Sequence, residues 1–349
     1  MQTRQVRAGS VAIGGGAPVS VQTMTNTDTR DVAATLDQIR RMADAGADIV
    51  RVSVYDEACA EAVRSLVDAS PVPLVADIHF DHKLAIRSIE NGVAKVRINP
   101  GNIGGEANVR ALADCLKQHR IPVRIGVNSG SIEKEILAKY GGVTPQGMVE
   151  SGLNHARMLE RAGYDDIVLS FKATNVRTMI EACRLAHQQT SYPQHIGVTE
   201  SGTADVGVVK SAVGIGTLLM EGIGDTIRVS ISGDPVQEVP AGLNILRACG
   251  LRSDFVEIIS CPTCGRTCID VEGIANAVRS ATLDIKKHIR VAVMGCSVNG
   301  PGEAREADLG VAGGRDGGAL IVKGQPPRAV RGDLAEILIQ EVRRYAAEH

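Results

Sequence analysis

Aromatic residues are scarce in this chain, which has no Trp, three Phe and five Tyr among 349 residues. Proteins that bind single-stranded nucleic acid stack the bases on aromatic side chains, and this composition offers too few of them. The formal net charge of −2 also provides no broad basic field for a phosphate backbone. The sequence therefore predicts no nucleic-acid partner.

Long apolar runs are missing as well. No stretch approaches the roughly 18 apolar residues of a membrane-spanning helix. The first ten residues also lack the apolar segment of a secretory signal. We therefore expect a cytoplasmic protein with no membrane partner. In a reducing compartment, eight cysteines are more typical of metal ligands and buried thiols than of disulfides.

Eight short runs rich in β-branched residues recur through the first 235 residues. Segments with apolar residues three or four apart lie between them, as in Asp31–Ala45, and are typical of helices. This alternation predicts a (β/α)8 TIM barrel of parallel strands, since a doubly wound sheet would need a dinucleotide-binding fingerprint to be preferred. The runs are Val19–Met24, Ile49–Val54, Leu74–Phe80, Lys95–Pro100, Val123–Asn128, Asp166–Lys172, His195–Glu200 and Thr226–Ser232.

The rhythm changes near Gly250, so we expect two domains, residues 1–250 and 251–349. The second should be a small α+β domain built around the cysteines. Its predicted elements are strands at Phe255–Ser260, Arg290–Met294 and within 307–323, and helices at Asp270–His288 and Leu334–Ala347. The glycine clusters at 214–216 and 313–318 lack any phosphate-loop context and predict turns.

Cationic side chains gather at the predicted strand ends, where TIM barrels place their active sites. Any one of them could point outward to a helix carboxylate, but five together favour an anion site. Because arginine binds phosphate oxygens bidentately, a phosphorylated substrate with one or two phosphoryl groups is expected. The side chains are Arg51, Arg97, Arg124, Lys172 and Arg228, accompanied by Asn128 and Ser230.

Glu200 is the only carboxylate among these strand-end groups. Its position predicts a role in proton transfer or in binding substrate hydroxyls, and a salt bridge that separates the arginines is the alternative. Asp77 and His79 are second acid–base candidates, although a structural role is the stronger interpretation for His79.

Cys261 and Cys264 have the C-x2-C spacing of a metal site, and Cys296 precedes a glycine-rich loop. Thiolates suit both zinc and iron–sulfur clusters. Three cysteines with Glu303 would make a four-ligand site whose oxygen ligand exchanges more readily than a thiolate. A phosphate-binding lyase or isomerase with a structural zinc domain is one alternative, and a non-enzymatic metal-binding module is another.

Motifs along the whole chain closely resemble the bacterial 4-hydroxy-3-methylbut-2-enyl diphosphate synthases. Two cysteine motifs, Cys-Pro-Thr-Cys-Gly-Arg-Thr (261–267) and Gly-Cys-Ser-Val-Asn-Gly-Pro-Gly-Glu (295–303), are the most specific. The others are Val-Gln-Thr-Met-Thr-Asn-Thr-Asp-Thr (21–29), Val-Ala-Asp-Ile-His-Phe-Asp (75–81), Val-Arg-Ile-Asn-Pro-Gly-Asn (96–102), Val-Arg-Ile-Gly-Val-Asn (123–128), Gly-Val-Thr-Glu (197–200) and Gly-Ile-Gly-Asp-Thr-Ile-Arg-Val-Ser (222–230).

The resemblance implies reductive ring opening of 2-C-methyl-D-erythritol 2,4-cyclodiphosphate, in non-mevalonate isoprenoid biosynthesis, at a [4Fe–4S] cluster. It implies cluster ligation by Cys261, Cys264, Cys296 and Glu303, with Asn299 beside the cluster. It further implies that the barrel cations, Asn128 and Ser230 hold the cyclic diphosphate. Cys268 departs from the family pattern and is a competing ligand. Because no flavin or nicotinamide site is evident, flavodoxin or ferredoxin is the expected electron donor.

The order of the elements also predicts a head-to-tail homodimer. The eighth barrel helix returns the chain to the face opposite the strand ends, and only residues 250–260 then precede Cys261. Fully extended, these residues span at most about 36–40 Å, which is roughly the size of the barrel itself. A neighbouring chain could supply the cysteine domain to each barrel without that strain.

Overall fold

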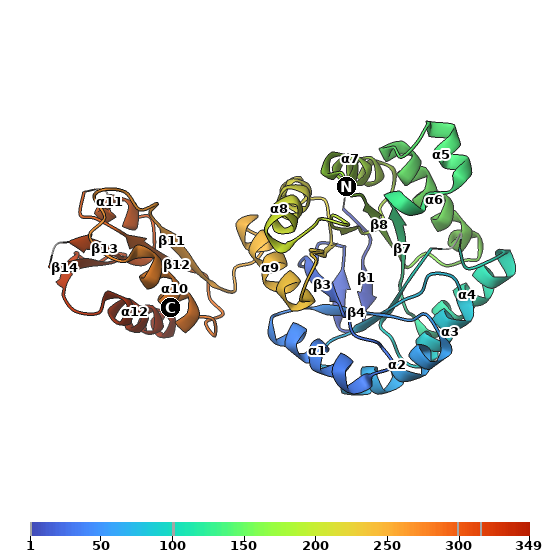
Figure 1. Cartoon of the computed structure of the whole chain (residues 1–349), viewed down its shortest axis with the longest axis horizontal. Coiled ribbons are helices and arrows are strands. Elements are labelled where there is room, and N and C mark those ends of the chain that lie inside the picture. Colours follow the sequence, from blue (N-terminus) through green and yellow to red (C-terminus); the bar gives the residue numbers. More distant parts are fainter. Residues whose placement is uncertain (1, 100–101, 299, 315) are drawn as a thin grey trace. The chain divides into compact units, whose positions relative to one another are not determined.

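The structure, a computed structural model, describes residues 2–99, 102–298, 300–314 and 316–349 (Figure 1). Its contacts divide the chain into two compact units, Met1–Leu251 and Arg252–His349. Among the described residues, no helix is long and apolar enough to cross a bilayer.

The first unit is a barrel of eight parallel strands, which confirms the predicted TIM barrel. The barrel closes where Leu169 of β8 bridges Gln194, and the Leu169 amide donates to the Pro193 carbonyl at 2.9 Å. The strands are β3 (Ser20–Met24), β4 (Ile49–Ser53), β5 (Leu74–Asp77), β6 (Lys95–Ile98), β7 (Val123–Asn128), β8 (Ile167–Lys172), β9 (His195–Ile196) and β10 (Thr226–Ile227).

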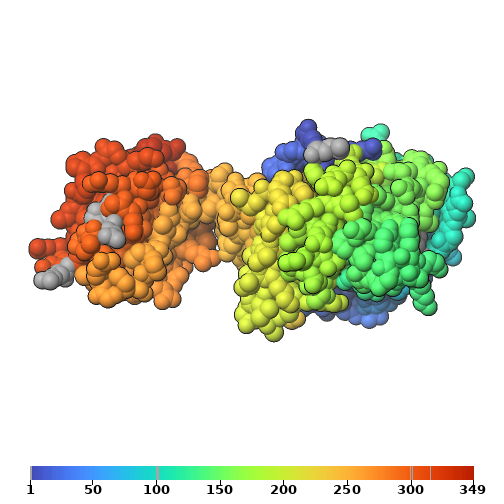
Figure 2. All heavy atoms as spheres, turned by 90° about the horizontal axis from the view of Figure 1, so that it is seen from above, coloured from blue at the N-terminus to red at the C-terminus, as the bar shows by residue number. Residues whose placement is uncertain are grey.

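Helices surround these strands, as Figure 1 shows. The predicted helix at Asp31–Ala45 is confirmed: the Asp31 side chain caps α1 by accepting from the Ala34 amide, and Ala45 ends it. In Figure 2, the barrel surface seen from above is formed largely by the green and yellow segments. The helices of this unit include α1 (Val32–Asp44), α2 (Glu57–Ala69), α3 (His82–Glu90), α4 (Glu106–His119), α5 (Lys134–Tyr140), α6 (Pro145–Arg161), α7 (Val176–Gln189), α8 (Ala204–Met220) and α9 (Glu238–Ala248).

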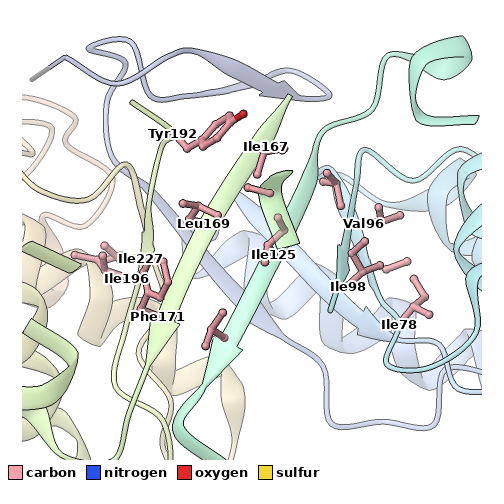
Figure 3. Close-up of a cluster of buried hydrophobic side chains, with 14 of the residues drawn as sticks. Ile78, Val96, Ile98, Ile125, Ile167, Leu169, Phe171, Tyr192, Ile196 and Ile227 are labelled. Atoms are coloured by element: carbon pink, nitrogen blue, oxygen red, sulfur yellow. The ribbon is translucent and has the colours of Figure 1, made fainter. Parts of the chain in front are cut away.

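The apolar core lies between the strands and the helices. Alternate strand residues such as Val96, Ile98, Ile125 and Leu169 point outward into this core and are fully buried (Figure 3). The residues between them point into the barrel. Near the C-terminal ends of the strands, most of these inward side chains are polar or charged. Because side chains alternate along each strand, one face of the sheet packs against the helices and the other carries the polar groups inside the barrel.

A hairpin of β1 (Val6–Ala8) and β2 (Val11–Ile13), which the sequence did not predict, precedes the barrel. Its buried Val6 and Ile13 share a cluster with Ile49, Val75 and Val168. These last three residues lie at the starts of barrel strands. The hairpin thus covers the N-terminal end of the barrel with apolar side chains.

Several sequence predictions need correction in this unit. The eighth strand stops at Ile227, so Arg228 and Ser230 follow it rather than lie on it, and the third strand stops at Asp77, before His79. The seventh strand stops at Ile196, so Glu200 lies in the loop that follows it rather than at the strand end. The glycine cluster at 214–216 lies inside α8 and forms no turn. A Cβ on Gly214 would lie 2.7 Å from Met179 Cε and 3.0 Å from Val198 Cγ2, so the glycine serves close packing of this helix.

The second unit is an α+β domain with a mixed sheet in the order β11-β12-β13-β14-β15, as the sequence predicted in outline. The first three strands are parallel and the last two antiparallel. The helix expected to reach His288 ends at Ala281, and β15 was not predicted. The elements are β11 (Val256–Ser260), α10 (Val271–Ala281), β12 (Ile289–Met294), α11 (Gly300–Ala304), β13 (Leu309–Gly314), β14 (Gly317–Val322), β15 (Arg328–Val330) and α12 (Leu334–Glu348).

Candidate active site

A cavity of about 270 Å³ lies at the C-terminal ends of the barrel strands. Five cationic side chains and one carboxylate line it, so its charge is strongly positive. All seven barrel residues predicted to bind the substrate contribute to this one cavity. Its lining comprises Met24, Arg51, Asp77, His79, Arg97, Arg124, Gly126, Asn128, Lys172, Thr199, Arg228 and Ser230.

Asp77 is the carboxylate of the cavity, and it serves two arginines. Its Oδ1 lies 3.0 Å from Arg97 Nη1, and its Oδ2 lies 3.6 Å from Arg51 Nε. Burial raises the pKa of the Asp77 carboxyl, but the charges of Arg51 and Arg97 outweigh burial and hold that pKa well below its usual range. His79 Nε2 lies 2.9 Å from Arg97 Nη1. Burial lowers the pKa of this imidazole, which favours a neutral acceptor.

Arg124 is buried in the cavity and makes no ion pair among the described residues. It is 1% exposed, and its Nη1 makes a long 3.4 Å hydrogen bond to Ser170 Oγ. Its Nε and Nη2 are buried without a hydrogen-bond partner among the described residues. Burial, together with the neighbouring charges of Arg51 and Arg97, lowers the pKa of Arg124. A bound anion would satisfy these donors and this charge at once.

Lys172 and Asn128 are register neighbours at the upper ends of β8 and β7. In the described part of the chain, the Lys172 ammonium makes neither a hydrogen bond nor an ion pair. A Cβ at Gly197 would lie 3.2 Å from Lys172 Nζ, so the glycine leaves room for the ammonium. Burial and the charges of Arg124 and Arg228 lower the pKa of Lys172, which again indicates a site prepared for negative charge.

Arg228 is held from behind by Glu238 at the start of α9. Its Nε and Nη2 lie 3.0 and 3.1 Å from the two carboxylate oxygens, a bidentate pair. Glu238 is 2% exposed and also accepts from Thr23 Oγ1 at 2.9 Å. The guanidinium keeps its Nη1 toward Met24, 3.5 Å from the sulfur. Glu238 therefore fixes the orientation of an arginine that faces the cavity.

Glu200 does not line the cavity, although the preceding Thr199 does. Its φ of +52° lies in the left-handed region, which is unfavourable for a residue with a Cβ. Its Oε2 accepts from Thr174 Oγ1 at 2.8 Å, and the side chain is exposed. A strained backbone held by a side-chain hydrogen bond is typical of residues that loops position for function.

A second cavity, of about 250 Å³, lies in the C-terminal unit. Cys261 follows β11 and Cys296 follows β12, and these strands are parallel neighbours. The Cys261 amide donates to the Val293 carbonyl at 3.2 Å, and Cys261 Sγ accepts from the Gly295 amide at 3.1 Å. The cavity is lined by Cys261, Pro262, Cys264, Arg266, Met294, Gly295, Cys296, Gly300 and Glu303.

Cys264 lies in a turn whose neighbouring groups favour its thiolate form. Backbone and side-chain hydrogen bonds from Arg266, with the charge of its guanidinium, lower the pKa of the Cys264 thiol and favour the thiolate. Cys268 differs: its Sγ lies 3.3 Å from the Arg266 carbonyl, and it is not part of the cavity lining. The structure thus groups Glu303, rather than Cys268, with the three other cysteines.

These residues fit an iron–sulfur cluster. Thiolates are its usual protein ligands, and the cavity presents three cysteines and one carboxylate around a common space. Among the described residues, no three His, Cys, Asp or Glu side chains converge on one point as ligands of a single ion. Ligands of a [4Fe–4S] cluster bind separate irons and are placed around it. Asn299, predicted beside the cluster, lies outside the described residues.

Sequence reasoning overlooked several contributors to the two cavities. Glu238 opens a helix and gave no signal, because its partner Arg228 belongs to a separate element. Arg266 was visible only as part of the cysteine motif. Gly126 faces the barrel interior, where a Cβ would lie 2.6 Å from Arg97 Nε. Its position within an alternating strand, between Arg124 and Asn128, was the available signal.

Each of the two units matches a model of a known protein family. Residues 3–243 match the family model described as the GcpE TIM-barrel domain, and residues 257–344 match the GcpE protein C-terminal domain. The Vibrio fischeri ES114 7,8-dihydropteroate synthase has a TM-score of 0.52 at 12% identity, covering 70% of this chain and 97% of that one. Yersinia pestis dihydropteroate synthase gives 0.51 at 16% identity, with the same coverage. These likenesses show the barrel fold alone.

Two relatives are similar over nearly their whole length, and both are named 4-hydroxy-3-methylbut-2-en-1-yl diphosphate synthase (flavodoxin). The protein from Caldanaerobacter subterraneus subsp. tengcongensis is 54% identical over 347 residues, covering 99% of this chain and 98% of the relative. The Clostridium perfringens protein is also 54% identical, with 97% of each chain covered. With both family models matched in order, this chain belongs to the GcpE family of 4-hydroxy-3-methylbut-2-en-1-yl diphosphate synthases.

Proposed function

We propose that this enzyme converts 2-C-methyl-D-erythritol 2,4-cyclodiphosphate into 4-hydroxy-3-methylbut-2-enyl diphosphate in isoprenoid biosynthesis. The reaction consumes two electrons and two protons, opens the ring at a carbon–oxygen bond and releases one hydroxyl as water. The observation that carries the proposal is the pair of sites in one chain: a cationic cavity for the diphosphate, and a cavity lined by cysteines.

The barrel residues bind and orient the substrate. Arg124 offers a buried guanidinium with unused donors, Lys172 offers a buried amine that makes no ion pair among the described residues, and Arg97 and Arg228 are held in place by carboxylates. Donors that are already ordered lose little entropy when they bind an anion. Asn128 and Ser230 complete the proposed binding set with neutral polar groups.

Cys261, Cys264, Cys296 and Glu303 are the proposed cluster ligands. When bound, a [4Fe–4S] cluster supplies single electrons and a Lewis-acidic iron for a substrate oxygen. The chain itself prepares the site: Cys261 Sγ accepts a hydrogen bond from the Gly295 amide, and Arg266 lowers the pKa of the Cys264 thiol. Glu303 would hold the cluster through a carboxylate oxygen, a ligand that exchanges more readily than a thiolate.

Glu200 is proposed to handle a proton or a hydroxyl near the reacting carbons. Its position directly after Thr199 places it in the loop that borders the cavity. The hydrogen bond from Thr174 Oγ1 and the left-handed φ restrict where its carboxylate can lie. A restrained carboxylate is suited to proton transfer, because the acceptor geometry is set before the substrate reacts.

Flavodoxin, or a ferredoxin in its place, is the proposed electron donor, since the relatives carry flavodoxin in their names. We further propose a head-to-tail homodimer in which each barrel works with the partner's cysteine unit. Seven residues, 249–255, separate the end of α9 from the start of β11. Even fully extended, they span only about 25 Å, which is less than the width of a barrel.

The test is an anaerobic assay of the purified protein with the cyclic diphosphate and reduced flavodoxin, alongside metal analysis. We expect brown protein with about four irons per chain and flavodoxin-dependent formation of the linear diphosphate. Colourless protein that contains zinc and no iron would contradict the proposal. That result would favour a phosphate-binding lyase or isomerase with a structural zinc domain.

A further inference from the structure

A second polar layer lies in the barrel beneath the cationic cavity. Lys95 and His195 are the first residues of β6 and β9, and both are 0% exposed. Lys95 precedes Arg97 by two residues on β6, so the two side chains share the inward face of this strand. Gly197 lies two residues after His195, just beyond the end of β9, and a Cβ there would lie 3.2 Å from Lys172 Nζ. Both side chains therefore lie two residues closer to the N-terminal end of the barrel than groups that border the substrate cavity.

Lys95 is buried without a counter-charge. Its Nζ donates to the neutral Gln22 Oε1 at 3.2 Å, and within the described residues it makes no ion pair. His195 is equally isolated: its Nδ1 and Nε2 are both buried and have no hydrogen-bond partner in that part of the chain. A buried ammonium without a carboxylate is costly, so this arrangement favours the neutral amine.

The surrounding charges add to this preference. Facing the interior are Arg51 from β4, Asp77 from β5, Arg97 from β6, Arg124 from β7, Lys172 from β8, His195 from β9 and Arg228, which follows β10, with Glu238 behind it. Both carboxylates are already paired with arginines. Burial and the charges of Arg124 and Arg51 hold the pKa of Lys95 well below its ordinary value. Burial and Arg124 likewise lower the pKa of His195.

We propose that Lys95 is a proton acceptor beneath the anion site, which takes up a proton from solvent when the diphosphate binds above it. This inference rests on the proposed function, which supplies the diphosphate. The negative charge of the ligand offsets the guanidinium charges that disfavour the ammonium. The new ammonium then adds one more positive charge under the anion. Binding and protonation reinforce each other, so affinity falls as pH rises.

Titration calorimetry tests this coupling. The cyclic diphosphate is titrated into wild type and Lys95→Met at pH 7.5, in buffers of different ionisation enthalpy. The slope of the binding enthalpy against buffer enthalpy gives the number of protons taken up. Wild type should take up as much as about one proton more than the variant. As the pH rises, the ratio of wild-type affinity to the affinity of Lys95→Met should fall by up to about tenfold per pH unit. Ionisation of the ligand's phosphates is common to both proteins and cancels in the difference.

Lys286→Met, at an exposed lysine of the second unit, is the matched control and should behave as wild type. Lys95→Met should unfold at the same temperature or higher, since it removes an uncompensated buried amine. If Lys95→Met unfolds at a lower temperature than wild type, the same calorimetric comparison is made with Lys95→Gln. Equal proton uptake with and without Lys95 overturns the inference. The inference is also overturned if His195→Gln abolishes the proton uptake and Lys95→Met does not, since the proton would then bind the imidazole. Absence of binding to wild type would contradict the proposed function itself.

Discussion

The Asp77 carboxylate lies 3.0 Å from the Arg97 guanidinium, and the two residues are register partners on adjacent strands β5 and β6. The same carboxylate lies 3.6 Å from Arg51. One buried anion thus orders two of the five cations of the cavity. It leaves most of the positive charge for a ligand to neutralise.

Asp77→Asn should lower the free energy of unfolding by about 3–5 kcal/mol, because it leaves two buried guanidiniums without their carboxylate. Inorganic pyrophosphate should restore part of this loss by supplying negative charge in the cavity. Urea unfolding with and without pyrophosphate measures both effects. Asp68→Asn is the control, since this exposed carboxylate pairs with Arg64 on one helix and should cost less than about 1 kcal/mol.

The pH dependence of the same variant follows from the depressed pKa of Asp77. A carboxyl whose folded pKa lies below its unfolded value of about 3.9 stabilises the fold fully above that value. Its contribution is lost as the pH falls toward the folded pKa. The stability gap between wild type and Asp77→Asn should therefore stay constant from pH 7 to about 5 and narrow below about pH 4. A gap that widens in acid would contradict the ionised state assigned here.

Arg124→Ala should weaken binding of the cyclic diphosphate by about 1.5–3 kcal/mol, the loss of a charge-assisted hydrogen bond. The fold should tolerate the change, because two guanidinium nitrogens have no protein partner among the described residues. Calorimetry measures the affinity, and unfolding checks the fold. Arg110→Ala, an exposed residue of α4, is the matched control and should bind normally. Unchanged affinity in Arg124→Ala would remove this residue from the binding site.

Cluster ligation separates four cysteines into two classes. Replacing Cys261, Cys264 or Cys296 by Ser should abolish iron binding, since each removes a thiolate from the cavity. Cys268→Ser should keep the iron and the visible absorption, because Cys268 lies outside that lining. Glu303→Ala should weaken the cluster and stop turnover. Iron analysis and absorption spectra decide the assignment, and loss of iron in Cys268→Ser with retention in Glu303→Ala would reverse it.

Mixed dimers test the proposed assembly. Glu200→Gln should bind substrate normally but turn over very slowly, because it loses a charge and a proton acceptor while keeping its shape. Cys296→Ser should be inactive through loss of the cluster. A mixture of the two should regain activity if each barrel works with the partner's cysteine unit. Confirmed exchange of chains without recovery would show that each active site forms within one chain.

The sequence predicted the barrel because its alternation is strong and local, and it predicted the cations because strand ends share one edge of a barrel. It failed where the determinant is a contact between separate elements. The left-handed φ of Glu200 and the Arg228–Glu238 pair depend on packing between elements, and the β1–β2 hairpin depends on residues that follow much later. The homodimer, the cytoplasmic location and the role of Asn299 stay predictions.

The hairpin at the barrel base has a consequence for synthesis on the ribosome. Residues 6–13 emerge before the barrel strands, yet their apolar side chains pack against Val168 as well as Ile49 and Val75. They cannot be fully buried until β8 has been made and the barrel closes. A nascent chain must therefore keep an apolar segment exposed until β8 has been made, when aggregation is a hazard. Variants that weaken the hairpin should lower the yield of native protein more than they lower its activity per molecule.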